Sequence, residues 1–143
     1  MKKHIDRAII RLVFATGISS VVTQLMTIRE VLAQFQGNEI VIALVLFNWL
    51  CLGGLGTLLA RVITRRLWRA TIIILGWLSL VLCGLSALQI PAIRELRNLI
   101  FISGSSVGFY PTWLFSFLSI APYCLLLGFL LPFSLFVIRA GIS

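Results

Sequence analysis

The chain has 143 residues, of which 60% are hydrophobic and only 11% charged, and its mean hydropathy is +1.10. Soluble domains carry about a quarter charged residues, so this composition excludes an ordinary soluble protein and predicts an integral membrane protein. The formal net charge is +8. Because the basic residues flank apolar segments, we attribute this charge to membrane topology and anionic headgroups; we expect the lipid bilayer as a partner and no nucleic acid.

Residues that bind metals or haem are few. The single histidine, His4, lies in the basic N-terminal segment, and Cys51, Cys83 and Cys124 are far apart in apolar segments. This spacing matches neither a local metal motif nor a haem attachment motif. We therefore expect no metal, no cofactor and no catalytic residue, and the chain is not predicted to be an enzyme.

Four apolar segments reach the length of about 20 residues that a helix needs to cross a bilayer. They cover residues 8–35, 40–60, 70–90 and 112–138. Helices are expected because an isolated strand would leave backbone polar groups unpaired in lipid. The N-terminus resembles a signal peptide, but its apolar part continues well past Val22 without a small-residue cleavage site, so we assign it to the first span. The predicted fold is an all-α, polytopic membrane protein, with one transmembrane domain over residues 1–143.

The polar link "QGN", residues 36–38, is short enough to make the first two spans an antiparallel hairpin. With four spans, most basic residues then fall on one side of the membrane. The residues on that side are Lys2, Lys3, Arg7, Arg11, Arg61, Arg65, Arg66, Arg69 and Arg139. The positive-inside rule therefore predicts that both termini are cytoplasmic.

The connection between the third and fourth spans is the longest. Within residues 92–101, Ile93, Leu96 and Ile100 share one helical face, whereas the charged residues lie elsewhere. This pattern favours a short helix in the outer membrane interface, with an ordinary loop as the alternative. Pro122 and Pro132 lie inside the fourth span and predict that this helix is bent.

Six polar residues of the first span are spaced three or four positions apart, which places them on one helical face. They are Thr16, Ser20, Thr23, Thr27, Glu30 and Gln34, and we name them the polar stripe. A stripe of this kind should face protein or water and not lipid. Small residues with similar spacing in the next two spans predict close helix packing. The candidate packing residues are Gly53, Gly56, Gly76 and Cys83.

Charged residues gather where the first hairpin turns. The candidate cluster consists of Gln24, Arg29, Glu30, Asn38 and Glu39. In one interpretation it is a clamp, in which Arg29 pairs with Glu39 or Glu30 and Asn38 locks the hairpin. In the other it is a polar site that holds a solute, a lipid headgroup or a partner. We favour the clamp, because Arg at the interface can reach water and a charge there costs little.

The stretches "QLMTIREVLAQFQGNEI" and "NWLCLGGLGTLLARVITRR" resemble the N-terminal membrane part of bacterial spermidine-synthase-like membrane proteins, which fuse a major-facilitator-like membrane domain to an aminopropyltransferase-like domain. The matching residues are Gln24, Arg29, Glu30, Phe35, Gly37, Asn38, Glu39, Gly53, Gly56, Gly128 and Pro132. Ala60 departs from the acidic residue usual in the major-facilitator loop. The 143 residues hold no Gly-rich cofactor loop and no acidic cluster for a polyamine. The resemblance therefore implies the membrane module, in a bacterial inner membrane, without the transfer chemistry.

Three functions fit these observations. The first is a non-catalytic membrane module, an anchor or small subunit packed with partner membrane proteins or with copies of itself. The second is a half-transporter or solute-binding module with a polar site at Glu30. The third, implied by the resemblance alone, is the membrane part of a longer aminopropyltransferase. We favour the first, because no catalytic constellation is present and small residues line several spans.

Overall fold

The computed structural model describes residues 2–35, 39–66, 72–101 and 107–142. This part of the chain is helical and contains no strand, which confirms the predicted all-α class. The helices are α1 (Lys2–Gln34), α2 (Glu39–Arg66), α3 (Ile72–Ile100) and α4 (Phe109–Ile142). All four are long and apolar enough to cross a membrane, so the prediction of a multi-pass membrane protein also holds. Each helix extends beyond the predicted span at one end or both.

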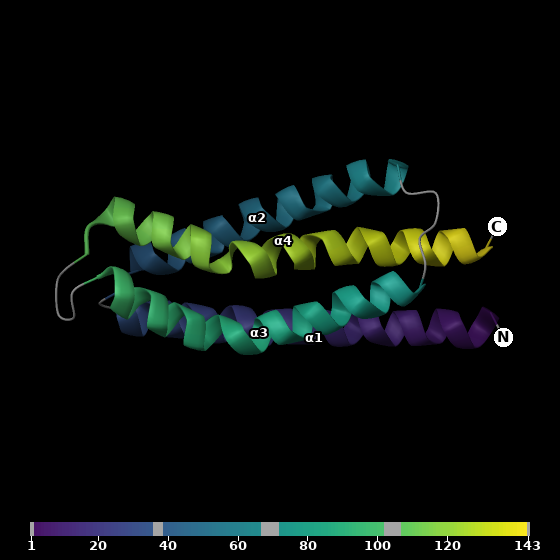
Figure 1. Cartoon of the computed structure of the whole chain (residues 1–143), viewed down its shortest axis with the longest axis horizontal. Helices are drawn as coiled ribbons and strands as arrows, with labels where there is room; N and C mark the ends of the chain where they lie inside the picture. Colours follow the sequence, from purple (N-terminus) through teal and green to yellow (C-terminus); the bar gives the residue numbers. More distant parts are fainter. Residues whose placement is uncertain (1, 36–38, 67–71, 102–106, 143) are drawn as a thin grey trace.

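The helices lie side by side along the long axis, and the two chain ends lie at the same end of the bundle (Figure 1). We call this the terminal end, and the opposite end, where α1 gives way to α2, the distal end. Among the described residues α4 contacts every other helix, most extensively α2, whereas no Cα atoms of α2 and α3 lie within 8 Å of each other. The antiparallel α1 and α2 pack only weakly on each other, so the sequence-adjacent hairpin is not the main packing unit.

Helix α3 is longer than the third predicted span. Residues 92–100 are helical, as predicted, but they continue α3 through Pro91 and do not form a separate helix; the loop alternative is wrong. Proline removes one backbone hydrogen bond, which usually ends or kinks a helix. Here Ile93, two residues later, is fully buried against the other helices and keeps the following turns packed on the bundle.

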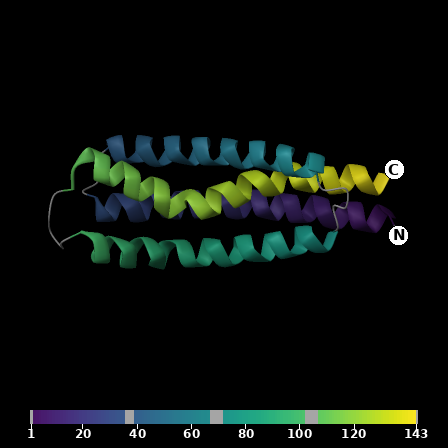
Figure 2. The same cartoon turned by 45° about the horizontal axis from the view of Figure 1, so that its top comes forward.

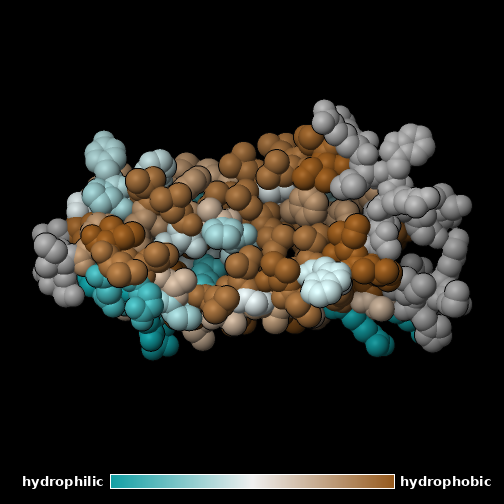
Figure 3. Space-filling view, viewed as in Figure 1, coloured by the Kyte–Doolittle hydropathy of each residue, from teal (hydrophilic) through white to brown (hydrophobic). Residues whose placement is uncertain are grey.

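Helix α4 curves along its length (Figure 2), as expected from Pro122 and Pro132 inside it. The surface that the figures present is mostly apolar over the middle, with hydrophilic residues near the ends (Figure 3). This distribution suits a bundle surrounded by lipid.

The apolar core is divided into two clusters. The large core cluster joins residues of all four helices, from Ile9 in α1 to Val137 in α4. The distal core cluster also draws on all four helices and lies toward the distal end. It consists of Val31, Phe35, Val41, Val45, Ile93 and Phe115.

Glycines bring α2 and α4 into close contact. A Cβ atom built at Gly56 would meet the Leu125 carbonyl oxygen and lie 3.0 Å from the Cα of Gly128. A Cβ atom at Gly128 would meet the Gly53 carbonyl oxygen and lie 3.0 Å from the Cα of Gly53. At Gly56 and Gly128 only glycine permits this separation of the two backbones, which agrees with the packing role predicted for Gly56. Gly53 contributes its backbone to the contact, while no atom lies within 4 Å of a Cβ atom built there.

The other two predicted packing residues do not pack within the chain. Gly76 and Cys83 are exposed, and no atom lies within 4 Å of a Cβ atom built at Gly76. The reason is the rotation of α3, which turns inward a face about 100° away around the helix. The buried residues of that face are Leu75, Leu82, Gln89 and Ile93.

Substitution of Gly56 should test this close approach. We expect Gly56→Val to lower the free energy of unfolding by about 1–3 kcal/mol or more, because the added methyl groups force the α2 and α4 backbones apart. Gly54→Val is the matched control, since Gly54 is exposed and no atom lies within 4 Å of a Cβ atom built there. Thermal unfolding of the purified protein in detergent measures both. Equal destabilisation by the two substitutions would contradict the role of Gly56.

Candidate functional site

The polar stripe of α1 faces the other helices, as predicted. Thr16, Thr23, Thr27 and Glu30 are buried, and the remaining members of the stripe are half-buried. Two of the threonines satisfy their own hydroxyl groups, because Thr16 and Thr23 donate to backbone carbonyl oxygens four residues earlier, at 2.8 Å in both cases. These two hydroxyl groups therefore need no partner from another helix, and the hydrogen bonds from the stripe to α3 are found toward the distal end.

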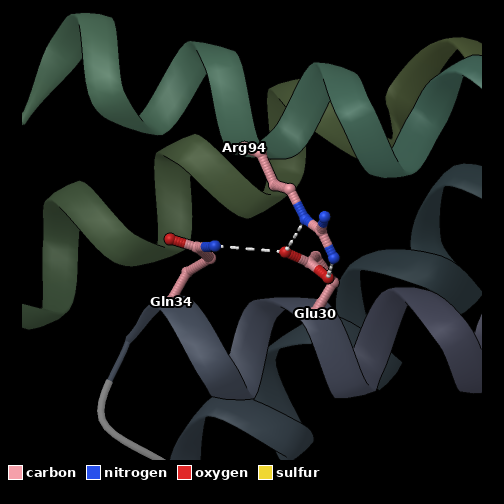
Figure 4. A network of polar contacts seen from close by, with 3 residues as sticks. All are labelled: Glu30, Gln34 and Arg94. Atoms are coloured by element: carbon pink, nitrogen blue, oxygen red, sulfur yellow. Dashed lines mark hydrogen bonds and ion pairs between the residues drawn. The ribbon is translucent and has the colours of Figure 1, made fainter.

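Glu30 is held by Arg94 of α3 (Figure 4). The Arg94 Nε atom donates to Glu30 Oε1 at 2.6 Å, and its Nη2 atom donates to Oε2 at 2.8 Å. Gln34, one turn further along α1, donates from Nε2 to Oε1 at 3.1 Å. Two parallel N–H···O bonds fix both the position and the orientation of the carboxylate.

The two partners differ in their surroundings. The Glu30 side chain is 11% exposed, whereas that of Arg94 is 58% exposed. The carboxylate is thus enclosed by the bundle, and the guanidinium closes it from outside while its far side stays free to reach water or headgroups. An enclosed charge requires such a partner, because a carboxylate left alone in an apolar bundle is strongly unfavourable.

The predicted clamp between Arg29 and Glu39 or Glu30 is wrong. Arg29 and Glu39 are exposed, and neither forms an ion pair among the described residues, while Asn38 lies outside them. Arg29 precedes Glu30 by about 100° around α1 and so points away from Glu30's partner. Gln24 is half-buried beside the stripe.

The sequence prediction does not identify Arg94 as the partner of Glu30, because it places Arg94 in a separate interfacial helix. With α3 continuous, Arg94 instead projects from its last turns beside the end of α1. One feature of the sequence does indicate Arg94 as a partner for Glu30. Apart from Arg29, only Arg94 and Arg97 are basic residues at this end of the predicted topology.

A second polar link joins α1 to α3 deeper in the bundle. Gln89 donates from Nε2 to the Thr27 hydroxyl oxygen at 2.9 Å, and both side chains are buried. The other amide atom, Gln89 Oε1, is buried and has no hydrogen-bond partner among the described residues. Sequence reasoning did not single out Gln89, although a lone glutamine in an apolar helix is itself an indication of an inward-facing position.

A third link joins α2 to α4. Asn48 donates from Nδ2 to the Ser116 hydroxyl oxygen at 2.9 Å, and Ser116 donates in turn to the Trp113 carbonyl oxygen at 2.9 Å. Both Asn48 and Ser116 are almost fully buried. Asn48 Oδ1, like Gln89 Oε1, is buried and accepts no hydrogen bond from any described residue.

These last two links lie at a similar depth. Counting along each helix at 1.5 Å per residue, the four residues lie about 10–17 Å from the distal helix ends. Each helix contributes one of them, and we call the set the polar layer: Thr27, Asn48, Gln89 and Ser116. No three His, Cys, Asp or Glu residues come together as a metal site in the described part of the chain.

Comparisons with protein-family models, with curated proteins and with solved structures find no match to this chain. The resemblance to spermidine-synthase-like membrane proteins therefore stays a prediction, and the function has to be argued from the geometry.

A double-mutant cycle tests the Glu30–Arg94 pair. We expect Arg94→Gln to lower the melting temperature more than Glu30→Gln, because only the first leaves an enclosed carboxylate without its cation. The double substitution should cost less than the sum of the two single ones. Arg29→Gln is the control on the same helix and should have little effect, because Arg29 is exposed and unpaired within the described residues. Additive effects in the cycle would show that the pair is not coupled.

Proposed function

We propose that this protein is a non-catalytic integral membrane module that packs against a second copy of itself or against other membrane subunits. The observation that supports this most directly is the outward face of α3. Gly76, Cys83, Gly84 and Ala87 are all exposed on this helix. A shallow groove of about 220 Å³ lies along it between Ile73, Gly76, Trp77 and Leu80.

Small residues on a lipid-facing helix allow another helix to approach closely, and in lipid such packing drives association. Within the described part of the chain nothing comes near this face, since no atom lies within 4 Å of a Cβ atom built at Gly76 or Gly84. A second copy is the simplest occupant. Two α3 helices related by a two-fold axis would present the same face to each other.

The topology that we propose places both termini in the cytoplasm of a bacterial inner membrane. The exposed basic residues Arg7, Arg11, Arg61 and Arg139 support it, because they lie on the parts of α1, α2 and α4 nearest the terminal end. Positive residues are retained on the cytoplasmic side of a membrane.

A solute-binding module is the second candidate. It is favoured by one feature that a plain anchor does not need, the enclosed carboxylate of Glu30 next to a buried polar layer. Ionisable groups inside membrane spans often mark sites for ions or solutes. The third possibility, the membrane part of an aminopropyltransferase, is supported by the resemblance alone.

Native cysteines provide a test of the α3 interface. Cys83 lies on the exposed face of α3, Cys51 is exposed on α2, and Cys124 is buried. If two α3 helices pair through this face, the two copies of Cys83 come close together. A disulfide forms where Cβ atoms lie about 3.5–4.5 Å apart, so a membrane-permeant oxidant should crosslink the protein through Cys83. The dimer band on a non-reducing gel should disappear in Cys83→Ser and persist in Cys51→Ser.

Gly76→Leu should reduce the crosslinked fraction severalfold by filling the groove, whereas Gly54→Leu, on the exposed surface of α2, should not. Crosslinking that depends on Cys51, or that is unchanged in Gly76→Leu, would argue against this face. A monomer that shows no crosslink in native membranes would instead point to a different partner.

Fusions at the C-terminus test the topology. We expect a fluorescent protein fused after Ser143 to fluoresce and alkaline phosphatase fused at the same point to be inactive, because the first matures in the cytoplasm and the second only outside it. An active phosphatase with a dark fluorescent fusion would reverse the orientation.

A further inference from the structure

We propose that the polar layer binds a small monovalent cation, of which Na⁺ is the type, through neutral oxygen atoms. The site is separate from the outward face of α3, so it does not depend on the proposed subunit packing. Its proposed ligands come from the four inward-facing residues of the layer, one from each helix: Thr27, Asn48, Gln89 and Ser116.

The layer interrupts the apolar core. Each of Thr27, Asn48 and Gln89 is followed, one turn closer to the distal end, by a residue of the distal core cluster. These residues are Val31 in α1, Val45 in α2 and Ile93 in α3. On the other side, Leu52 and Ile120 follow Asn48 and Ser116 by one turn and belong to the large core cluster. Core residues thus lie one turn before and one turn after the layer on the same helix faces. The side chains of the layer therefore also face the bundle interior.

The unsatisfied atoms of the layer are of one kind. Asn48 Oδ1 and Gln89 Oε1 are both amide carbonyl oxygens, both are buried, and neither accepts a hydrogen bond from a described residue. The amide nitrogen atoms of the same two side chains are already engaged, with the hydroxyl groups of Ser116 and Thr27. What the layer lacks is therefore an electropositive group.

Buried polar groups rarely stay unpaired, so an occupant is expected. The hydroxyl oxygens of Thr27 and Ser116 have each accepted one hydrogen bond and retain a lone pair. Two amide carbonyls and two hydroxyls make a set of oxygen ligands without formal charge. Carbonyl-type oxygens of this kind hold alkali cations in membrane channels and transporters.

Charge decides between a monovalent and a divalent ion. Ca²⁺ and Mg²⁺ sites rely on carboxylate ligands, and the layer contains none. The nearest carboxylate along α1 is Glu30, three residues from Thr27, and Arg94 already balances most of its charge. A single positive charge near this pair is tolerable, whereas a double charge would lack compensation.

The first experiment is thermal unfolding of the complete purified chain in detergent, with NaCl replaced by choline chloride at constant ionic strength. We expect the melting temperature to rise with Na⁺ in a saturable manner, because a ligand that binds only the folded state stabilises it. The charge of choline is shielded by methyl groups, so oxygen ligands cannot coordinate it as they coordinate Na⁺. It still screens the surface charges equally, and the comparison therefore separates binding from general salt effects. Direct binding of radioactive ²²Na⁺ to the same protein provides an independent reading.

Substitutions locate the ion. Asn48→Leu and Gln89→Leu, which remove the carbonyl ligands while keeping the size of the side chain similar, should weaken Na⁺ binding by about tenfold or more. Gln24→Leu is the matched control, because Gln24 is only half-buried and lies outside the layer. It should leave Na⁺ binding unchanged.

The unmodified chain keeps the proposal testable even if a variant fails to fold. Equal melting temperatures in NaCl and choline chloride, with no saturable binding of ²²Na⁺, would overturn it and leave water as the occupant of the layer. Binding that survives in both Asn48→Leu and Gln89→Leu would overturn it as well, since the ion would then lie elsewhere.

Discussion

Polar groups of a helix inside lipid must find partners within the protein, and this constraint determines how α1 is placed. Its span has a mean hydropathy of 1.6, against 2.1 to 2.2 for the other three, because it carries the polar stripe. Lipid cannot satisfy Thr27 or Glu30, so other helices have to cover that face. Helix α3 does so with an amide from Gln89 and a guanidinium from Arg94.

The bundle thus consists of two helix pairs held by different means. Polar links between side chains hold α1 to α3. Helices α2 and α4 share one such link, between Asn48 and Ser116, but they also approach so closely that Gly56 and Gly128 have no room for a side chain. Helix α4 joins the pairs, since among the described residues it contacts all three other helices, and its curvature lets it do so along its length. Sequence neighbours α1 and α2 are connected by a short link but contribute little packing to each other.

Properties that depend on one helix at a time could be predicted from the sequence. The number of helices, the inward direction of the polar stripe and the bend of α4 follow from hydropathy, spacing and proline positions. Properties that depend on the rotation and the length of a partner helix could not be predicted from the sequence. The third apolar span ends at residue 90, so Arg94 is not predicted as Glu30's partner, although α3 continues to Ile100. The small residues Gly76 and Cys83 do not indicate by themselves whether they face the bundle or the lipid.

Helix α3 connects the two proposed roles, because it contributes residues to both of them. Gln89 faces the bundle interior, whereas Gly76 and Cys83 are exposed. Arg94 lies about five helical turns beyond Gly76 on the same side of α3 and reaches from there to Glu30. A rotation of α3 that improved packing on an outside partner would also move the carbonyl of Gln89 relative to Thr27. The bond between Arg94 and Glu30 resists such a rotation, since its two parallel hydrogen bonds allow only one orientation of the guanidinium. The ion pair therefore keeps Gln89 beside Thr27.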